Sequence, residues 1–270
     1  MFSKLLKQDC RAIFKYWWIV SVASFALAAI GGFMQNIMDV RYTTHYYIQA
    51  AAMIIYFFCL AGVSASPTLV KLLMFIRFRK NFFTDEGYLT FTLPVNKTEL
   101  LGSKVLSSAI FSVASLLVVF VDIIVFFLTC GSWKAVRSMF REIGYFFESI
   151  FVPFEMSRFL IFLLAVILVI FIIVAINLFI FLCITLANIL VRRRKLLLGI
   201  GLYYSLNITF VLFMQFLSTN GVFSTVTGAF VFNEWYPVVM VLCITAATVA
   251  VVFGMYLVEL YLLDRKLNLE

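Results

Sequence analysis

The stretch FLIFLLAVILVIFIIVAINLFIFLCITLANILV, from Phe159 to Val191, contains no charged residue. A helix needs about 20 mostly apolar residues to span the hydrocarbon of a bilayer. This stretch is longer than that, so we expect a helix that is tilted or projects beyond the bilayer. The whole chain of 270 residues is similarly apolar, at 64% hydrophobic and 13% charged, whereas a soluble domain is about half apolar and about a quarter charged. The sequence therefore predicts an all-α integral membrane protein.

Six apolar stretches along the chain have the length of a transmembrane helix. They are Tyr16–Met38, Tyr47–Ser66, Val105–Cys130, Phe159–Val191, Leu196–Leu217 and Val238–Leu262. The segments between them are short compared with a folded domain. We therefore expect residues 1–270 to form a single transmembrane domain with six spans.

The distribution of Lys and Arg predicts the orientation of these spans, because cytoplasmic loops carry an excess of both residues. Sixteen of the 21 lie at the termini, between the second and third spans, or between the fourth and fifth. We therefore expect both termini to be cytoplasmic. The net charge of +8 is divided among these short clusters, which form no continuous face for a phosphate backbone, so nucleic-acid binding is not predicted.

Two segments outside the spans are amphipathic. Residues 1–15 alternate apolar and basic positions at helical spacing, which predicts a helix lying on the inner membrane surface before the first span. Residues 131–157 contain a second such pattern, which predicts an extracellular interfacial helix ended by Pro153. Within the first span, Ser24, Ala28 and Gly32 are spaced by four residues, and we expect them to let another helix approach closely.

The sequence lacks the motifs of an enzyme. It contains no H-E-x-x-H, no G-x-S-x-G and no G-x-x-x-x-G-K-[ST], so we expect neither catalysis nor nucleotide binding by this chain. No set of His, Cys and carboxylate residues has the spacing of metal ligands. The one histidine, His45, neighbours several tyrosines at the edge of the second span, where an interfacial role is expected.

Polar residues inside spans usually mark either a transport pathway or a helix–helix contact. Asp122 in the third span and Glu259 in the sixth are ionisable, and Asn177 in the fourth is not. Asp122 is compatible with an ion-coupled carrier. Glu259 is near enough to Arg265 and Lys266 to be an interfacial residue, and Asn177 is typical of packing contacts.

The segment between the second and third spans, residues 67–104, is the longest predicted cytoplasmic loop. Its first part, TLVKLLMFIRFRKNFF, predicts a helix that emerges from the membrane. Thr84 or Asp85 can cap a short helix after it, and Asn96 with Glu99 predicts the start of the third span. The apolar residues between these points suit either a partner's groove or the lipid headgroups.

The run TDEGYLTFTLPVNKTELLGSK in this loop resembles the first cytoplasmic loop of bacterial ABC transporter permeases of the type-2 export class. The C-terminal RKLNLE also resembles the tails of such permeases from Gram-positive bacteria. The resemblance implies that a coupling segment here docks on a separate ATP-binding subunit, flanked by Lys97 and Lys104. The implied coupling residues are Asp85, Glu86, Gly87, Tyr88, Leu89, Phe91 and Leu93.

The resemblance further implies the transmembrane subunit of an exporter in a bacterial plasma membrane. The subunit would pair with a second copy or a related permease, and ATP would be bound by the partner, with no cofactor in this chain. The cluster Arg192–Lys195 would be a second inner contact or a topology anchor. Aromatic-rich spans suit an amphipathic or lipid-like cargo. The alternatives are an ion-coupled secondary carrier that uses Asp122 and a non-transporting membrane partner protein.

Overall fold

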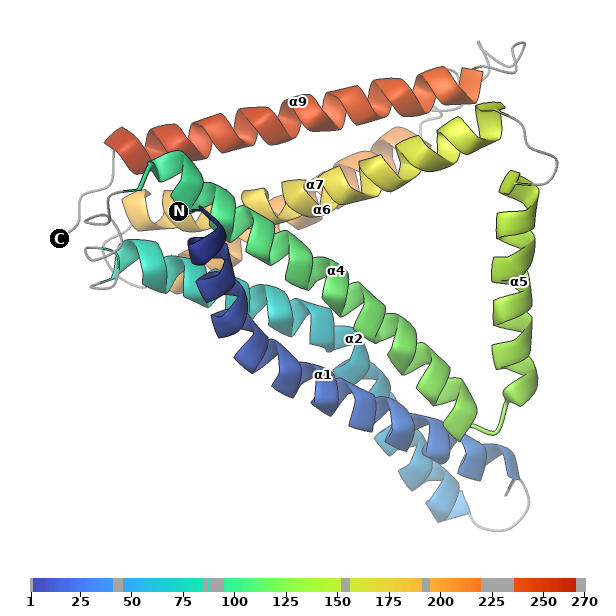
Figure 1. The fold of residues 1–270 in the computed structure, drawn as a ribbon. Coiled ribbons are helices and arrows are strands. Elements are labelled where there is room, and N and C mark those ends of the chain that lie inside the picture. The colour runs from blue at the N-terminus through green and yellow to red at the C-terminus, as the bar shows by residue number, and fades with distance from the viewer. Residues whose placement is uncertain are drawn as a thin grey trace. The chain divides into compact units, whose positions relative to one another are not determined.

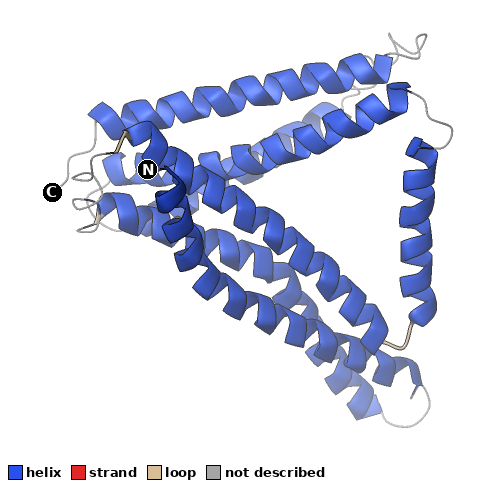
Figure 2. Ribbon diagram, viewed as in Figure 1, coloured by secondary structure: helices blue, strands red, loops and turns tan. Residues whose placement is uncertain are grey.

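The computed structural model describes residues 2–40, 46–84, 87, 95–151, 156–190, 195–219 and 236–265. Within these residues the secondary structure consists of seven α-helices and their connecting turns, without a β-strand. Figure 2 shows this helical content. The prediction of an all-α fold is confirmed for the described part of the chain.

The helices follow one another along the chain with the labels of Figure 1. Their bounds are α1 Phe2–Val40, α2 Tyr46–Phe83, α4 Lys97–Thr129, α5 Trp133–Phe151, α6 Met156–Leu190, α7 Lys195–Thr219 and α9 Tyr236–Arg265. The helix predicted in the segment 131–157 corresponds to α5. It ends at Phe151, and Pro153 lies outside the described residues.

Five of the helices, α1, α2, α4, α6 and α9, are long and apolar enough to cross a membrane. They correspond to the predicted first, second, third, fourth and sixth spans. The predicted fifth span is a 25-residue helix, α7. The apolar stretch described within it, Leu197–Thr209, is shorter than a bilayer crossing requires. The chain thus has the several apolar helices of a multi-pass membrane protein, and the sixth crossing stays a prediction.

The first two helices are longer than a single crossing. At 1.5 Å per residue, the 39 residues of α1 and the 38 of α2 extend about 59 and about 57 Å, compared with about 30 Å of hydrocarbon. Residues 2–15 of the predicted interfacial segment are continuous with the first span in α1. The helix predicted at the start of the loop is confirmed as the end of α2, which runs through Pro67 to Phe83.

The start and end of α4 follow from local backbone chemistry. The carbonyl oxygen of Asn96 accepts a hydrogen bond from the N–H of Leu100 (3.1 Å), and α4 begins at the next residue, as predicted. At the other end Gly131 has φ +75°, a conformation that favours glycine, and its N–H donates to the carbonyl of Leu128 (3.2 Å). The helix stops there, and α5 follows within a few residues.

The chain divides into two compact units. Unit 1 consists of Met1–Met74 and Leu106–Ser149, and unit 2 of Phe75–Val105 and Ile150–Glu270. Both α2 and α4 therefore contribute residues to each unit. Unit 1 contains α1 and most of α5, whereas unit 2 contains α6, α7 and α9.

The helices of unit 1 approach one another at small residues. A Cβ atom on Gly32 of α1 would lie 2.4 Å from the carbonyl oxygen of Phe126 in α4, so only glycine fits at this position. Ala28 and Ser24, one and two turns earlier, are each only 2% exposed. These contacts confirm that Ser24, Ala28 and Gly32 permit a close approach of another helix.

A second contact in unit 1 involves Trp17 of α1. Its Nε1 donates a hydrogen bond to Oγ of Ser115 in α4 (3.1 Å), and its ring meets that of Phe111 edge to face, with centroids 5.8 Å apart. Phe111 belongs to a buried cluster with Ile13 and Met74. A polar bond within an apolar cluster orients the indole and holds α1 to α4.

Unit 2 is built around α6, which packs against α7 and α9. Phe78 near the end of α2 stacks on Phe181 of α6, with ring centroids 4.1 Å apart and ring planes 10° from parallel. A Cβ atom on Gly199 of α7 would lie 2.9 Å from the ring of Phe75. The last turns of α2 therefore belong to the core of unit 2.

Candidate functional site

Most of the predicted coupling residues lie outside the residues that the structure describes. These are Asp85, Glu86, Tyr88, Leu89, Phe91 and Leu93. Gly87 is described and is buried. Its N–H donates to the carbonyl of Thr84 (2.7 Å), and a Cβ atom on it would lie 2.7 Å from the carbonyl oxygen of Phe82. The chain turns tightly against the end of α2, and only glycine fits this turn.

Thr84 participates in the same turn in a way that the sequence analysis did not anticipate. Its hydroxyl donates to the carbonyl of Lys80 (2.5 Å), so its side chain satisfies an acceptor at the C-terminal end of α2.

The start of α4, which follows the predicted coupling segment in the chain, is bonded to α9. The Lys97 ammonium forms an ion pair with Asp264, and the Tyr256 hydroxyl donates to the carbonyl of Thr98 (2.8 Å). Both contacts lie within unit 2. The segment thus leaves from a helix end packed on α6 and returns to a helix start bonded to α9.

Asp122 carries a buried carboxyl group in the last third of α4. It is 1% exposed, and neither carboxyl oxygen has a hydrogen-bond partner among the described residues. The side chain of Ser24 on α1 lies close to it, but the Ser24 hydroxyl donates to the carbonyl of Ser21 (3.0 Å). A buried carboxyl group without a hydrogen bond is unfavourable by about 1–3 kcal/mol, and an ionisable residue inside a span suggests a functional site.

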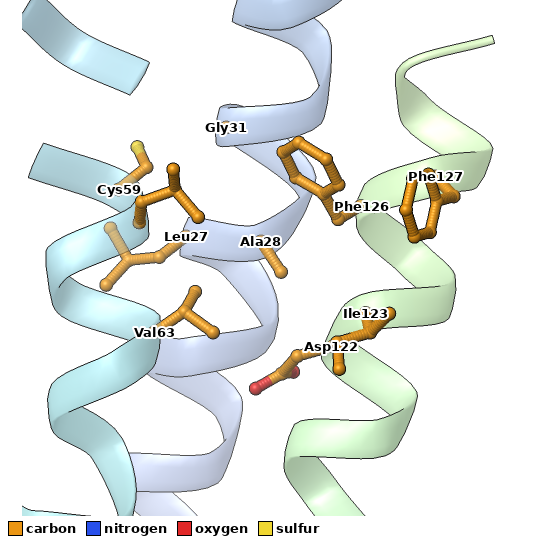
Figure 3. A pocket seen from close by; sticks show the side chains of 10 residues that line it. Leu27, Ala28, Gly31, Cys59, Val63, Asp122, Ile123, Phe126 and Phe127 are labelled. Carbon is orange, nitrogen blue, oxygen red and sulfur yellow. The ribbon is translucent and has the colours of Figure 1, made fainter. Parts of the chain in front are cut away.

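Two pockets of unit 1 border Asp122. The smaller, of about 210 Å³, lies between α1, α2 and α4 and is lined by apolar side chains such as Cys59 and Phe126. Figure 3 shows the Asp122 carboxyl group reaching from α4 toward α1 at the border of this pocket. The larger, of about 450 Å³, lies between α1 and α4 and is lined by Trp17, Trp18 and other residues. Asp122 is the one described lining residue that the two pockets share.

Glu259 lies in unit 2 and has a hydrogen-bond partner. It is fully buried, and Oγ1 of Thr185 on α6 donates to its Oε1 (2.5 Å), while Oε2 is unpaired among the described residues. The sequence predicted an interfacial residue near Arg265. The structure instead places the Glu259 side chain in the contact between α6 and α9. Thr185 was missed in the sequence, and no local signal connects two residues 74 positions apart.

Asn177 lies on α6 and is 2% exposed. Its Nδ2 donates to the carbonyl of Ile173 (3.0 Å) in the preceding turn of the same helix. Neither Asn177 nor Glu259 is among the described residues that line the two pockets bordering Asp122.

Among the described residues, no group of three or more His, Cys, Asp or Glu residues is arranged so that it could hold a metal ion. His45 lies outside the described part of the chain. No protein family, curated protein or solved structure matches this chain.

Proposed function

We propose that this chain is the transmembrane permease subunit of an ATP-binding cassette exporter in a bacterial plasma membrane. In this proposal the chain crosses the membrane six times with both termini in the cytoplasm. It pairs with a second copy or a related permease. A separate subunit binds and hydrolyses ATP, and it docks on the coupling segment from Asp85 to Leu93.

The observation that carries the proposal is the sequence GYLTFTLPV, which begins at the tight turn of Gly87 and lies between the long helices α2 and α4. Since α2 extends about 57 Å at 1.5 Å per residue, it is long enough to carry this segment beyond the bilayer surface. A soluble ATPase subunit would meet the segment there.

The proposal also explains why the helices on either side of the segment are continuous. Transmission of work between two sites needs an element with two arrangements and rigid connections to it. The helix α2 runs from the coupling turn into unit 1, and α4 runs from the segment to Asp122. A movement of the segment by the ATPase would therefore be passed along both helices.

The test is co-purification from native bacterial membranes in mild detergent, with an affinity tag on this chain. We expect an ATP-binding subunit to co-purify with the wild type and to be lost from Gly87→Ala and from Leu89→Asp. Gly144→Ala is the matched control for the glycine, because a Cβ atom there has nothing within 4 Å. If no ATPase co-purifies with the wild type, the exporter proposal is wrong.

An ion-coupled secondary carrier is the second candidate, and the unpaired carboxyl group of Asp122 favours it. Such a carrier would work in proteoliposomes that contain this chain alone. Asp122→Asn would then abolish transport driven by an ion gradient, whereas the exporter would show no transport without its ATPase.

A further inference from the structure

The geometry points to a binding site in unit 1 for a lipophilic organic cation, with its charge at Asp122 and its apolar body in the two adjoining pockets. This inference deepens the exporter proposal by naming a class of cargo, and that role as cargo rests on the proposed function. Binding itself does not depend on an ATPase.

Asp122 supplies the negative charge of the proposed site. Among the described residues that line the two pockets, Asp122 is the sole ionisable one apart from Cys59, so no Lys or Arg side chain there neutralises a carboxylate. Both oxygens are buried without a hydrogen bond. A bound molecule with a single positive charge would supply the missing partner for the carboxylate.

The two pockets beside Asp122 are large enough for a small organic molecule. The larger pocket, of about 450 Å³, is within the size range of small-molecule sites, about 300–1,000 Å³. The smaller pocket adds about 210 Å³. The volume exceeds that of a proton or a bare inorganic ion, and the lining is apolar almost throughout, which suits a hydrophobic body.

The larger pocket is partly lined by aromatic side chains. Trp17, Trp18 and Phe25 of α1 line the larger pocket, and aromatic faces attract organic cations as well as apolar groups. The indole of Trp17 is held in place by its hydrogen bond to Ser115. A metal ion is disfavoured because Ca²⁺ takes about 6–8 oxygen ligands and the described lining offers one carboxylate.

The experiment uses the purified full-length chain in lipid nanodiscs and measures equilibrium binding of tritiated tetraphenylphosphonium, with empty nanodiscs as the background. Tetraphenylborate, of nearly the same shape and opposite charge, is the matched probe. We expect saturable binding of the cation and none of the anion. Asp122→Asn should weaken cation binding by at least about tenfold.

Two further variants separate charge from space. Ala114→Phe places a ring in the larger pocket and leaves the carboxyl group intact, so it should also weaken cation binding. Glu259→Gln changes the other buried carboxyl group, which borders neither pocket, and should bind the cation as the wild type does. If the wild type binds the anion as tightly as the cation, or if Asp122→Asn binds the cation unchanged, the inference is overturned.

The cation-binding experiment and the ATPase co-purification experiment test the two proposals separately. Cation binding by a chain that captures no ATPase would leave the site standing and remove the exporter. Capture of an ATPase by a chain that does not bind the cation would support the exporter and overturn this site.

Discussion

The two buried carboxyl groups of this protein, Asp122 in unit 1 and Glu259 in unit 2, have almost the same exposure and different surroundings. Asp122 is 1% exposed and Glu259 is 0% exposed. Glu259 accepts a hydrogen bond from Thr185, among buried neighbours such as Cys183. Asp122 has no such bond and borders two pockets. Burial alone therefore does not distinguish these two carboxyl groups, whereas hydrogen bonding and the adjoining free volume do.

The largest effect is expected where α1 meets α4 beside the Asp122 site. Gly32→Ala places a Cβ atom 2.4 Å from the Phe126 carbonyl oxygen, so the two helices must separate. We expect a loss of about 2–3 kcal/mol in the free energy of unfolding, measured by thermal unfolding in detergent. Gly254→Ala is the matched control, because a Cβ atom there meets nothing within 4 Å. Equal stability of the two variants would contradict the close contact.

The next largest effect is expected for the hydrogen bond between Thr185 and Glu259. Thr185→Val keeps the side-chain shape and removes the donor to Glu259, which leaves a buried carboxyl group unpaired. We expect a loss of about 1–3 kcal/mol in the free energy of unfolding. Thr209→Val is the control, since that exposed hydroxyl donates only to its own helix, at the Ser205 carbonyl (2.8 Å). A loss no larger than that of the control would show that the bond contributes little.

A smaller effect of opposite sign is expected at the unpaired carboxyl group. Asp122→Leu removes a buried polar group that has no partner, and the adjoining pockets leave space for the larger side chain. We expect the free energy of unfolding to rise by about 1 kcal/mol, together with loss of cation binding. A fall in the melting temperature would mean that Asp122 stabilises unit 1 and would weaken the contrast with Glu259.

The smallest effect is expected for an exposed carboxylate. Asp264 pairs with Lys97, and their side chains are 62% and 47% exposed. We expect Lys97→Ala to change the free energy of unfolding by less than about 0.5 kcal/mol, with no further change on adding salt. A larger loss would indicate that the contact between α4 and α9 is stronger than an ordinary surface ion pair.

Much of the helical layout was predictable. Long apolar runs correspond to α1, α2, α4, α6 and α9, and the spacing of Ser24, Ala28 and Gly32 predicted the helix contact that Gly32 makes. The sequence pattern predicts the start of a loop at Pro67, whereas this residue lies inside α2. A single proline removes one backbone hydrogen bond, which long membrane helices tolerate.

The sequence by itself determined that the chain is apolar enough for a multi-pass membrane protein, because hydrophobicity and helical length are local properties of consecutive residues. It also identified Asp122 and Glu259 as the ionisable residues within spans. Only the tertiary structure decided that Thr185 pairs with Glu259 and that Asp122 lies unpaired beside two pockets. Those outcomes depend on which residues of different helices come within hydrogen-bonding distance and on the volume left between the helices, and no spacing along the chain encodes either one.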